Sequence, residues 1–102
     1  MNICTGTDSL ASTHSLSLLE ELRILADKEP GLSPQDLLFT VTGAPARALG
    51  MEHRLGCIRP FALADLIAIP FSEASGRATE AVLAHRGWVS WMMVNGQPSD
   101  FI

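Results

Sequence analysis

The sequence predicts an α/β fold, in which three helical segments are followed by a small mixed sheet. Between residues 18 and 49, apolar side chains recur at the spacing of one helix face. After Gly50 this spacing gives way to short apolar runs that end at glycine or proline, a pattern typical of strands. Asn95-Gly96, near the end of the chain, is the standard sequence of a two-residue hairpin turn.

The first helix is predicted over residues 18–28, because Ser17 and Glu20 form a capping-box pattern at its start. Pro30-Gly31 ends this helix, since proline and glycine both interrupt helical backbone. Its apolar residues lie on one face, so we expect that face to be buried.

Two shorter helices are predicted next. Ser33-Pro34 begins the second helix as its N-cap and first-turn proline. The third fits residues 45–49, and Gly50 is placed to end it in the left-handed conformation.

The second half of the chain contains the predicted strands. Residues 88–94 give the strongest of them, with apolar side chains on both faces. Pro98 places the last strand at an edge of the sheet, because proline cannot donate a ladder hydrogen bond. A further helix is predicted over residues 74–85, before Gly87. The predicted strands are residues 2–5, 56–58, 65–69, 88–94 and 97–102.

The composition is that of one compact domain. The chain has 102 residues, of which 47% are hydrophobic and 18% are charged, so it forms a core rather than a disordered tail. This apolar content is high for so short a chain and indicates surface that something else covers. The net charge is −4 and no basic stripe is present, which excludes a nucleic-acid backbone as partner.

The sequence also predicts a cytoplasmic protein without a membrane segment. No apolar run approaches the roughly 20 residues that a membrane-spanning helix requires. The first residues lack the basic region and apolar core of a signal peptide. Cys4 and Cys57 are too few for a disulfide scaffold, and both are expected to be small buried side chains in a reducing compartment.

Asp8 is the candidate catalytic residue. It follows the predicted strand 2–5, an arrangement that delivers a carboxylate to a site at the end of a strand. An aspartate after Gly-Thr is, by itself, more often a turn or capping residue. The choice between these roles therefore depends on the rest of the chain.

Five motifs in the correct order and at the correct spacing resemble the C-terminal part of the amidohydrolase superfamily, nearest to its aminohydrolase branch of chlorohydrolases and deaminases. The third motif, residues 42–50, is similar to the family signature Thr-x-Asn-(Gly/Pro)-Ala-x-Ala-Leu-Gly. The motifs are Gly6-Thr7-Asp8-Ser9-Leu10-Ala11-Ser12, Leu18-Leu19-Glu20-Glu21-Leu22-Arg23, Thr42-Gly43-Ala44-Pro45-Ala46-Arg47-Ala48-Leu49-Gly50, the pair Arg54-Leu55-Gly56-Cys57-Ile58 and Ala64-Asp65-Leu66-Ile67, and Val94-Asn95-Gly96.

The resemblance implies a metal-dependent hydrolase of carbon–nitrogen bonds, such as a deaminase of a purine-type or other ring amine. Residues 1–50 would be the last strand and helices of a (β/α)₈ barrel, and residues 51–102 part of a small C-terminal β-sandwich with its closing Asn-Gly hairpin. Asp8 would bind zinc or another divalent metal and take a proton from the attacking water. Ser9 and Ser12 are weaker candidates for contacts with the substrate.

The chain alone lacks the metal ligands that the resemblance requires. The family has a His-x-His pair on its first barrel strand, and no two histidines here are two residues apart. Zinc takes three or four protein ligands, so Asp8 alone cannot hold it stably. His14, His53 and His85 lack ligand spacing and are expected in loops or at a helix end. Whether this polypeptide is itself an enzyme is therefore left open.

Three interpretations of the chain remain. It is the C-terminal fragment of an aminohydrolase, inactive alone; one half of a split hydrolase; or a free-standing interaction module that uses the exposed apolar surface. The first two require a missing N-terminal barrel segment as partner, and self-association is the other partner that the apolar surface could have. We favour the first interpretation, because an unpaired barrel strand and open sandwich edges are unfavourable in isolation.

Two residues depart from the family pattern. Ala44 stands where the family usually has asparagine, which removes a side chain able to hold the backbone at the helix entry. Phe61 stands where a turn between two strands usually has glycine. If that turn keeps a positive φ, phenylalanine there is strained.

Overall fold

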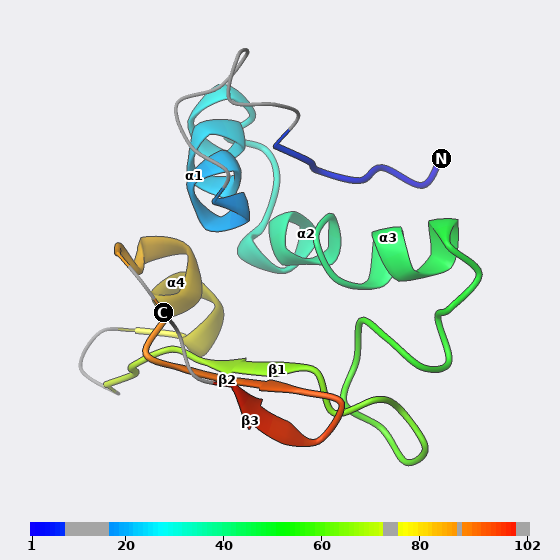
Figure 1. Ribbon diagram of the computed structural model, residues 1–102. Coiled ribbons are helices and arrows are strands. Elements are labelled where there is room, and N and C mark those ends of the chain that lie inside the picture. Colours follow the sequence, from blue (N-terminus) through cyan, green and yellow to red (C-terminus); the bar gives the residue numbers. More distant parts are fainter. Residues whose placement is uncertain (8–16, 73–75, 88, 100–102) are drawn as a thin grey trace.

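The computed structural model describes residues 1–7, 17–72, 76–87 and 89–99. The described part contains four helices and three strands in the α/β arrangement that the sequence predicts (Figure 1). In chain order these are α1 (Leu18–Lys28), α2 (Pro34–Phe39), α3 (Gly43–Ala48), β1 (Leu66–Ala68), α4 (Ala78–Ala84), β2 (Trp91–Val94) and β3 (Gln97–Ser99). None of these helices is long and apolar enough to cross a membrane.

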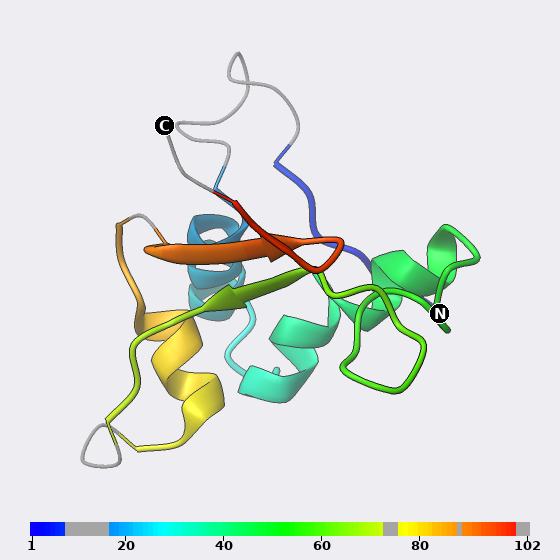
Figure 2. The same ribbon diagram turned by 60° about the horizontal axis from the view of Figure 1, so that its bottom comes forward.

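The helices and the sheet form two layers (Figures 1 and 2). Helices α1, α2 and α4 pack against one another, and β1, β2 and β3 form a sheet beneath them. Arg23 on α1 donates a hydrogen bond to the backbone oxygen of His85 at the end of α4, at 2.6 Å. Thus α4, which follows β1 in the sequence, is joined to the helices of the first half of the chain.

The first two helices begin at the caps that the sequence predicts. The Ser17 hydroxyl accepts a hydrogen bond from the Glu20 amide, and α1 has the predicted bounds. At α2, Ser33 and Asp36 form a complete capping box, in which each side chain accepts from the backbone amide of the other. These caps satisfy amides that a helix N-terminus leaves without intrahelical partners.

Helix α3 also ends as predicted. Gly50 has φ +70°, its amide donates to Arg47, and the next amide, that of Met51, donates to Ala46. This pair of hydrogen bonds is a Schellman motif. The start of α3 differs from the prediction, because the helix begins at Gly43 rather than at residue 45. Its N-cap, Thr42, makes no side-chain capping bond, because the Thr42 hydroxyl donates instead to the Leu38 carbonyl at 2.8 Å.

Two predicted strands are wrong. Residues 56–58 form no strand, because Gly56 has φ +83° and the preceding residues form a turn in which Arg54 and Leu55 both donate to Met51. Residues 2–5 form no strand either. Their described backbone hydrogen bond goes from Thr5 to the Thr40 carbonyl, beyond α2, and no described strand lies beside them.

The remaining elements are present but shorter than predicted. β1 covers residues 66–68 of the predicted 65–69, and the described part of β2 begins at residue 91. Helix α4 begins at residue 78, after Gly76 with φ +99°. β3 ends at residue 99. Residues 74–75, 88 and 100–102, which the predictions for α4, β2 and β3 included, lie outside the described part of the chain.

The sheet of the described residues is antiparallel throughout, so the prediction of a mixed sheet is wrong. Its order is β1-β2-β3, which places β3 at an edge as Pro98 predicts. Asn95-Gly96 makes the predicted hairpin turn, with φ +50° and +76°. The segment before β1 stabilises this turn through two hydrogen bonds. Asp65 Oδ1 accepts from the Asn95 amide at 2.7 Å, and the Ala64 carbonyl accepts from the Gly96 amide at 3.0 Å. Two motifs of the family resemblance therefore bind each other.

We expect Asp65→Ala to lower the free energy of unfolding by about 1 kcal/mol, because it removes a charge-assisted hydrogen bond at an exposed site. Asp65→Asn keeps an acceptor oxygen and should lose less. Amide hydrogen exchange at Asn95 measures the effect directly. Equal exchange in the alanine variant and the wild-type chain would contradict this role of Asp65.

The core is small for the length of the chain. Among the described residues, four hydrophobic ones are buried, Leu22, Leu37, Ala44 and Ala46, together with the polar Thr40. Hydrophobic residues of the sheet remain open to solvent on both faces: Ile67 is 50% exposed and Trp91 40% exposed, and they point to opposite faces by the register of the strands. An antiparallel sheet with solvent on one side normally has one polar face, whereas this sheet exposes a large hydrophobic side chain on each face.

Phe61 has the positive φ at which a residue with a Cβ is expected to be strained. Its φ is +70°, and the Ala62 amide donates to the Arg59 carbonyl at 3.2 Å, which makes residues 59–62 a turn with Pro60 and Phe61 at its centre. Glycine is favoured at this position because it has no Cβ to clash with the backbone. The side chain is 97% exposed, so no burial compensates for the strain.

We therefore expect Phe61→Gly to raise the free energy of unfolding by about 0.5–1 kcal/mol. Relief of about 1–2 kcal/mol of left-handed strain outweighs the greater freedom of glycine in the unfolded chain. Phe61→Ala is the control, because it removes the ring and keeps the strain. Chemical denaturation that finds the two variants equally stable would contradict the strain.

Candidate functional site

The predicted site residues lie outside the part of the chain that the structure describes. This applies to Asp8, to the candidate substrate contacts Ser9 and Ser12, and to His14. The described residues nevertheless fix the segment that leads to Asp8, and they contain a groove that the sequence did not predict.

The segment before Asp8 is attached to the junction of α2 and α3. The Thr5 amide donates to the Thr40 carbonyl at 2.9 Å, and the Thr5 hydroxyl donates to the Thr40 hydroxyl at 2.8 Å. Thr40 is only 8% exposed, and its hydroxyl donates in turn to the Leu37 carbonyl at 2.6 Å. Asn2 Nδ2 donates to the carbonyl of Ala44 at 2.7 Å. Residues 2–5 therefore have a defined position beside the buried residues of α2 and α3.

The described residues do not fit a metal site by themselves. No three of their His, Cys, Asp or Glu side chains gather in a way that could hold an ion. His53 is exposed in the turn after α3, and His85 is the C-cap of α4, so both have the loop and helix-end positions predicted for them. A metal site that uses Asp8 would need ligands beyond the described residues.

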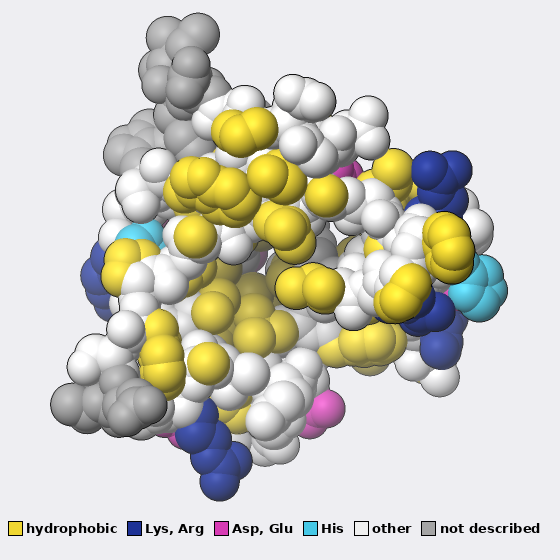
Figure 3. All heavy atoms as spheres, turned by 90° about the horizontal axis from the view of Figure 1, so that it is seen from below, with side chains coloured by type: hydrophobic (Ala, Val, Ile, Leu, Met, Phe, Trp, Pro, Cys, Tyr) yellow, Lys and Arg dark blue, Asp and Glu magenta, His cyan; other side chains and the backbone are white. Residues whose placement is uncertain are grey.

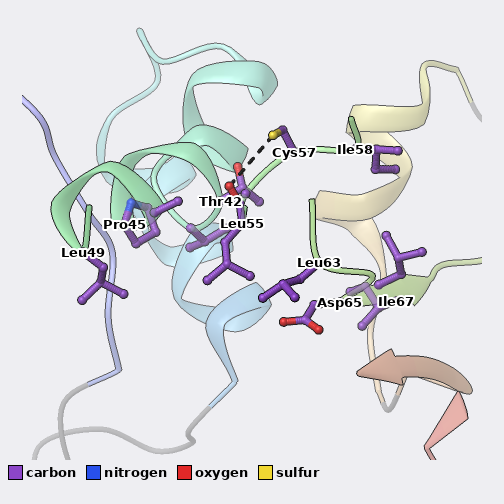
Figure 4. Close-up of a pocket in the computed structure, with 13 residues that line it drawn as sticks. Thr42, Pro45, Leu49, Leu55, Cys57, Ile58, Leu63, Asp65 and Ile67 are labelled. Carbon is purple, nitrogen blue, oxygen red and sulfur yellow. Dashed lines mark hydrogen bonds between the residues drawn. The ribbon is translucent and has the colours of Figure 1, made fainter. Parts of the chain in front are cut away.

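An apolar groove separates α3 from β1 (Figure 4). Its volume is about 430 Å³, and we call it the α3–β1 groove. Pro45 and Leu49 lie on the α3 side, Leu63 and Ile67 lie on the β1 side, and Leu55 lies between them. The wall is formed by residues 41–42, 45–46, 49, 55–58, 63 and 65–67. The groove therefore brings together two of the five motifs, the third and both parts of the fourth.

Both cysteines are exposed, so the prediction of buried cysteines is wrong. Cys57 follows Gly56 on the wall of the α3–β1 groove, where its sulfur accepts a hydrogen bond from Arg59 Nε at 3.0 Å. The prediction rested on the general tendency of free cysteine to be buried, and Cys57 instead lies in an irregular segment after Gly56, which has φ +83°.

The comparisons with known proteins agree with the resemblance. The sequence matches the profile of the Amidohydrolase family over residues 1–98. It is 30% identical over 80 residues to the 5-methylthioadenosine/S-adenosylhomocysteine deaminase of Teredinibacter turnerae, covering 72% of this chain and 18% of that one. It is 32% identical to the enzyme of the same name from Pyrococcus furiosus, covering 95% of this chain and 26% of that one.

The three-dimensional comparison leads to the same family. A crystal structure of an adenosine deaminase from Xanthomonas campestris with bound zinc has a TM-score of 0.81 and 28% sequence identity. The match covers 96% of this chain and 25% of that one. The chain thus spans about a quarter or less of the relatives described here. Since the family profile covers almost all of its residues, the chain belongs to the amidohydrolase family.

Proposed function

We propose that this chain supplies the C-terminal part of a metal-dependent hydrolase that removes an amino group from a purine-type ring. The observation that carries the proposal is the family match over residues 1–98, in which the five motifs keep their order. The named relatives are deaminases of 5-methylthioadenosine and S-adenosylhomocysteine and an adenosine deaminase. These three compounds are therefore the substrates to test first.

In this proposal residues 1–50 form the end of a (β/α)₈ barrel, and residues 51–102 form part of the small β-sandwich. Asp8 is a metal ligand and the catalytic acid–base group, while Ser9 and Ser12 contact the substrate. The attachment of Thr5 to Thr40 supports this role, because it fixes the backbone three residues before Asp8. The other metal ligands belong to the part of the family fold that this chain does not match.

The chain alone is expected to be inactive, because its described residues bring no metal-ligand cluster together. A free-standing interaction module is the alternative. The small core favours the first proposal, since four buried hydrophobic residues within the part of the chain that the structure describes are few for an independent domain.

A single-chain hybrid tests the proposed function. In the Xanthomonas campestris adenosine deaminase, the quarter that this chain matches is replaced by residues 1–102, so that the remaining part supplies the other ligands. We call that remaining part the complementary segment. The hybrid should bind zinc and release ammonia from at least one of the three candidate substrates.

The control is the same hybrid with Asp8→Asn, which keeps the size of the side chain and removes its charge. Loss of a general acid–base group typically lowers the rate by about 100-fold to 10,000-fold. A folded, zinc-containing hybrid whose rate is unchanged by Asp8→Asn would refute the role of Asp8. A folded hybrid without any deaminase activity would refute the proposed function.

A further inference from the structure

Hydrogen bonds attach residues 2–5 to the junction of α2 and α3 at two points (Figure 1). At one point Thr5 bonds to Thr40 through both its amide and its hydroxyl. At the other, Asn2 Nδ2 donates to the carbonyl of Ala44, a completely buried residue. Because the two attached residues are three positions apart, the bonds set the direction of the segment as well as its place.

The chemistry of this attachment differs from that of the face below the sheet. Figure 3 shows hydrophobic side chains gathered over the sheet and around a hollow beside it. Apolar contacts are non-directional, so they would let a segment slide or rotate against its neighbours. A hydrogen bond weakens steeply as its angle departs from linear, so it also fixes orientation. Residues 2–5 are therefore held in the way that delivery of a side chain to a site requires.

The hydroxyl bond between Thr5 and Thr40 is not needed to satisfy buried polar groups. The buried Thr40 hydroxyl donates to the Leu37 carbonyl at 2.6 Å, and that carbonyl also accepts from the Thr40 amide at 3.1 Å. Valine at both threonine positions would keep the shape and leave no hydroxyl donor without an acceptor. Paired replacements of this kind can be nearly neutral for stability. The hydroxyl pair is therefore better explained by where it holds the chain than by the stability it adds.

We propose that Thr5 and Thr40 are positioning residues for Asp8, whose carboxylate their hydroxyl bond directs to the site. Asp8 follows Thr5 by three residues, which span at most about 11 Å, so a fixed Thr5 restricts where the carboxylate can lie. Thr7, one residue before Asp8, is half-buried, so the chain stays against the protein up to that point. This inference rests on the proposed function, since it takes Asp8 as the acid–base group.

The single-chain hybrid tests the positioning role, with the complementary segment unchanged in every variant. Thr5→Val combined with Thr40→Val removes the hydroxyl bond and keeps both side-chain shapes. We expect kcat per bound zinc to fall by about 10-fold to 100-fold, because a displaced catalytic group slows the chemical step. KM should change much less, and the melting temperature should be nearly unchanged. Amide hydrogen exchange at residue 5 should become faster, since the segment is held less firmly.

Two controls separate positioning from stability. Thr5→Ser combined with Thr40→Ser keeps both hydroxyls, so this variant should recover most of kcat. Ser33→Ala removes a cap at the other end of α2, so it should lower the melting temperature and leave kcat unchanged.

An unchanged kcat in the double valine variant would overturn the positioning role. Equal losses of kcat in that variant and in Ser33→Ala would also overturn it, because reduced stability would then be the cause. If Asp8→Asn lowers the rate and the double valine variant does not, only the positioning role of Thr5 and Thr40 is refuted. If Asp8→Asn has no effect, the proposed role of Asp8 is refuted and the positioning role with it.

Discussion

Replacing Leu22 by alanine is expected to lower the free energy of unfolding by about 3–5 kcal/mol, the largest loss we expect from one substitution in α1. Leu22 is completely buried and is the largest fully buried side chain among the described residues. Truncation removes its transfer free energy and leaves a cavity that the surrounding helices only partly close. Chemical denaturation followed by circular dichroism measures the change.

Leu18→Ala is the control for this prediction, because it makes the same change on the same helix at a residue that is 42% exposed. Its cost should stay below about 1.5 kcal/mol, since the side chain already contacts water in the folded state. Equal losses in the two variants would show that Leu22 is no more deeply buried than Leu18, which lies on the same helix face one turn earlier. The small set of buried residues makes this a sharp test of the fold.

The helices were predictable from the sequence because their ends are set by local chemistry. Ser17 and Ser33 each bond to a backbone amide three residues later, and Gly50 adopts a left-handed conformation without requiring any distant contact. A hairpin at Asn95-Gly96 was predictable for the same reason. In each case the determining interaction lies within a few residues.

The failed predictions depend on distant residues. The segment 56–58 has a strand-like composition, but Gly56 lies against the backbone of Thr42, 14 positions earlier, with a positive φ. Residues 2–5 would need a neighbouring strand, and their described backbone partner is instead the Thr40 carbonyl. β1 is shorter than its apolar run because its length is set by the residues of β2 that pair with it.

One part of the candidate site was predictable from the sequence and another part was not. Asp8 was identified from a motif, since the order of motifs along a chain is visible in the sequence. The α3–β1 groove was not, because exposure of Leu49, Ile58 and Ile67 depends on how three separate segments pack. The high apolar content was the one signal of it in the sequence, and composition does not say which side chains are left uncovered.

Gly56→Ala is expected to lower the free energy of unfolding by about 2–5 kcal/mol. The residue has φ +83°, a conformation that costs a residue with a Cβ about 1–2 kcal/mol. An added Cβ would also lie 2.5 Å from the Thr42 carbonyl oxygen, so the backbone itself must move. Such overpacking typically costs about 1–3 kcal/mol more. Thermal or chemical unfolding of the purified variant measures the sum.

Substitutions at two other glycines separate the conformational cost from the contact cost. Gly50 has a positive φ (+70°) but no atom within 4 Å of an added Cβ, so Gly50→Ala should lower the free energy of unfolding by only about 1–2 kcal/mol. Gly31 has neither a positive φ nor such a contact, so Gly31→Ala should be nearly neutral. If Gly50→Ala costs as much as Gly56→Ala, the contact with Thr42 is unimportant. Because Gly56 and Thr42 both line the α3–β1 groove, forcing them apart alters its wall.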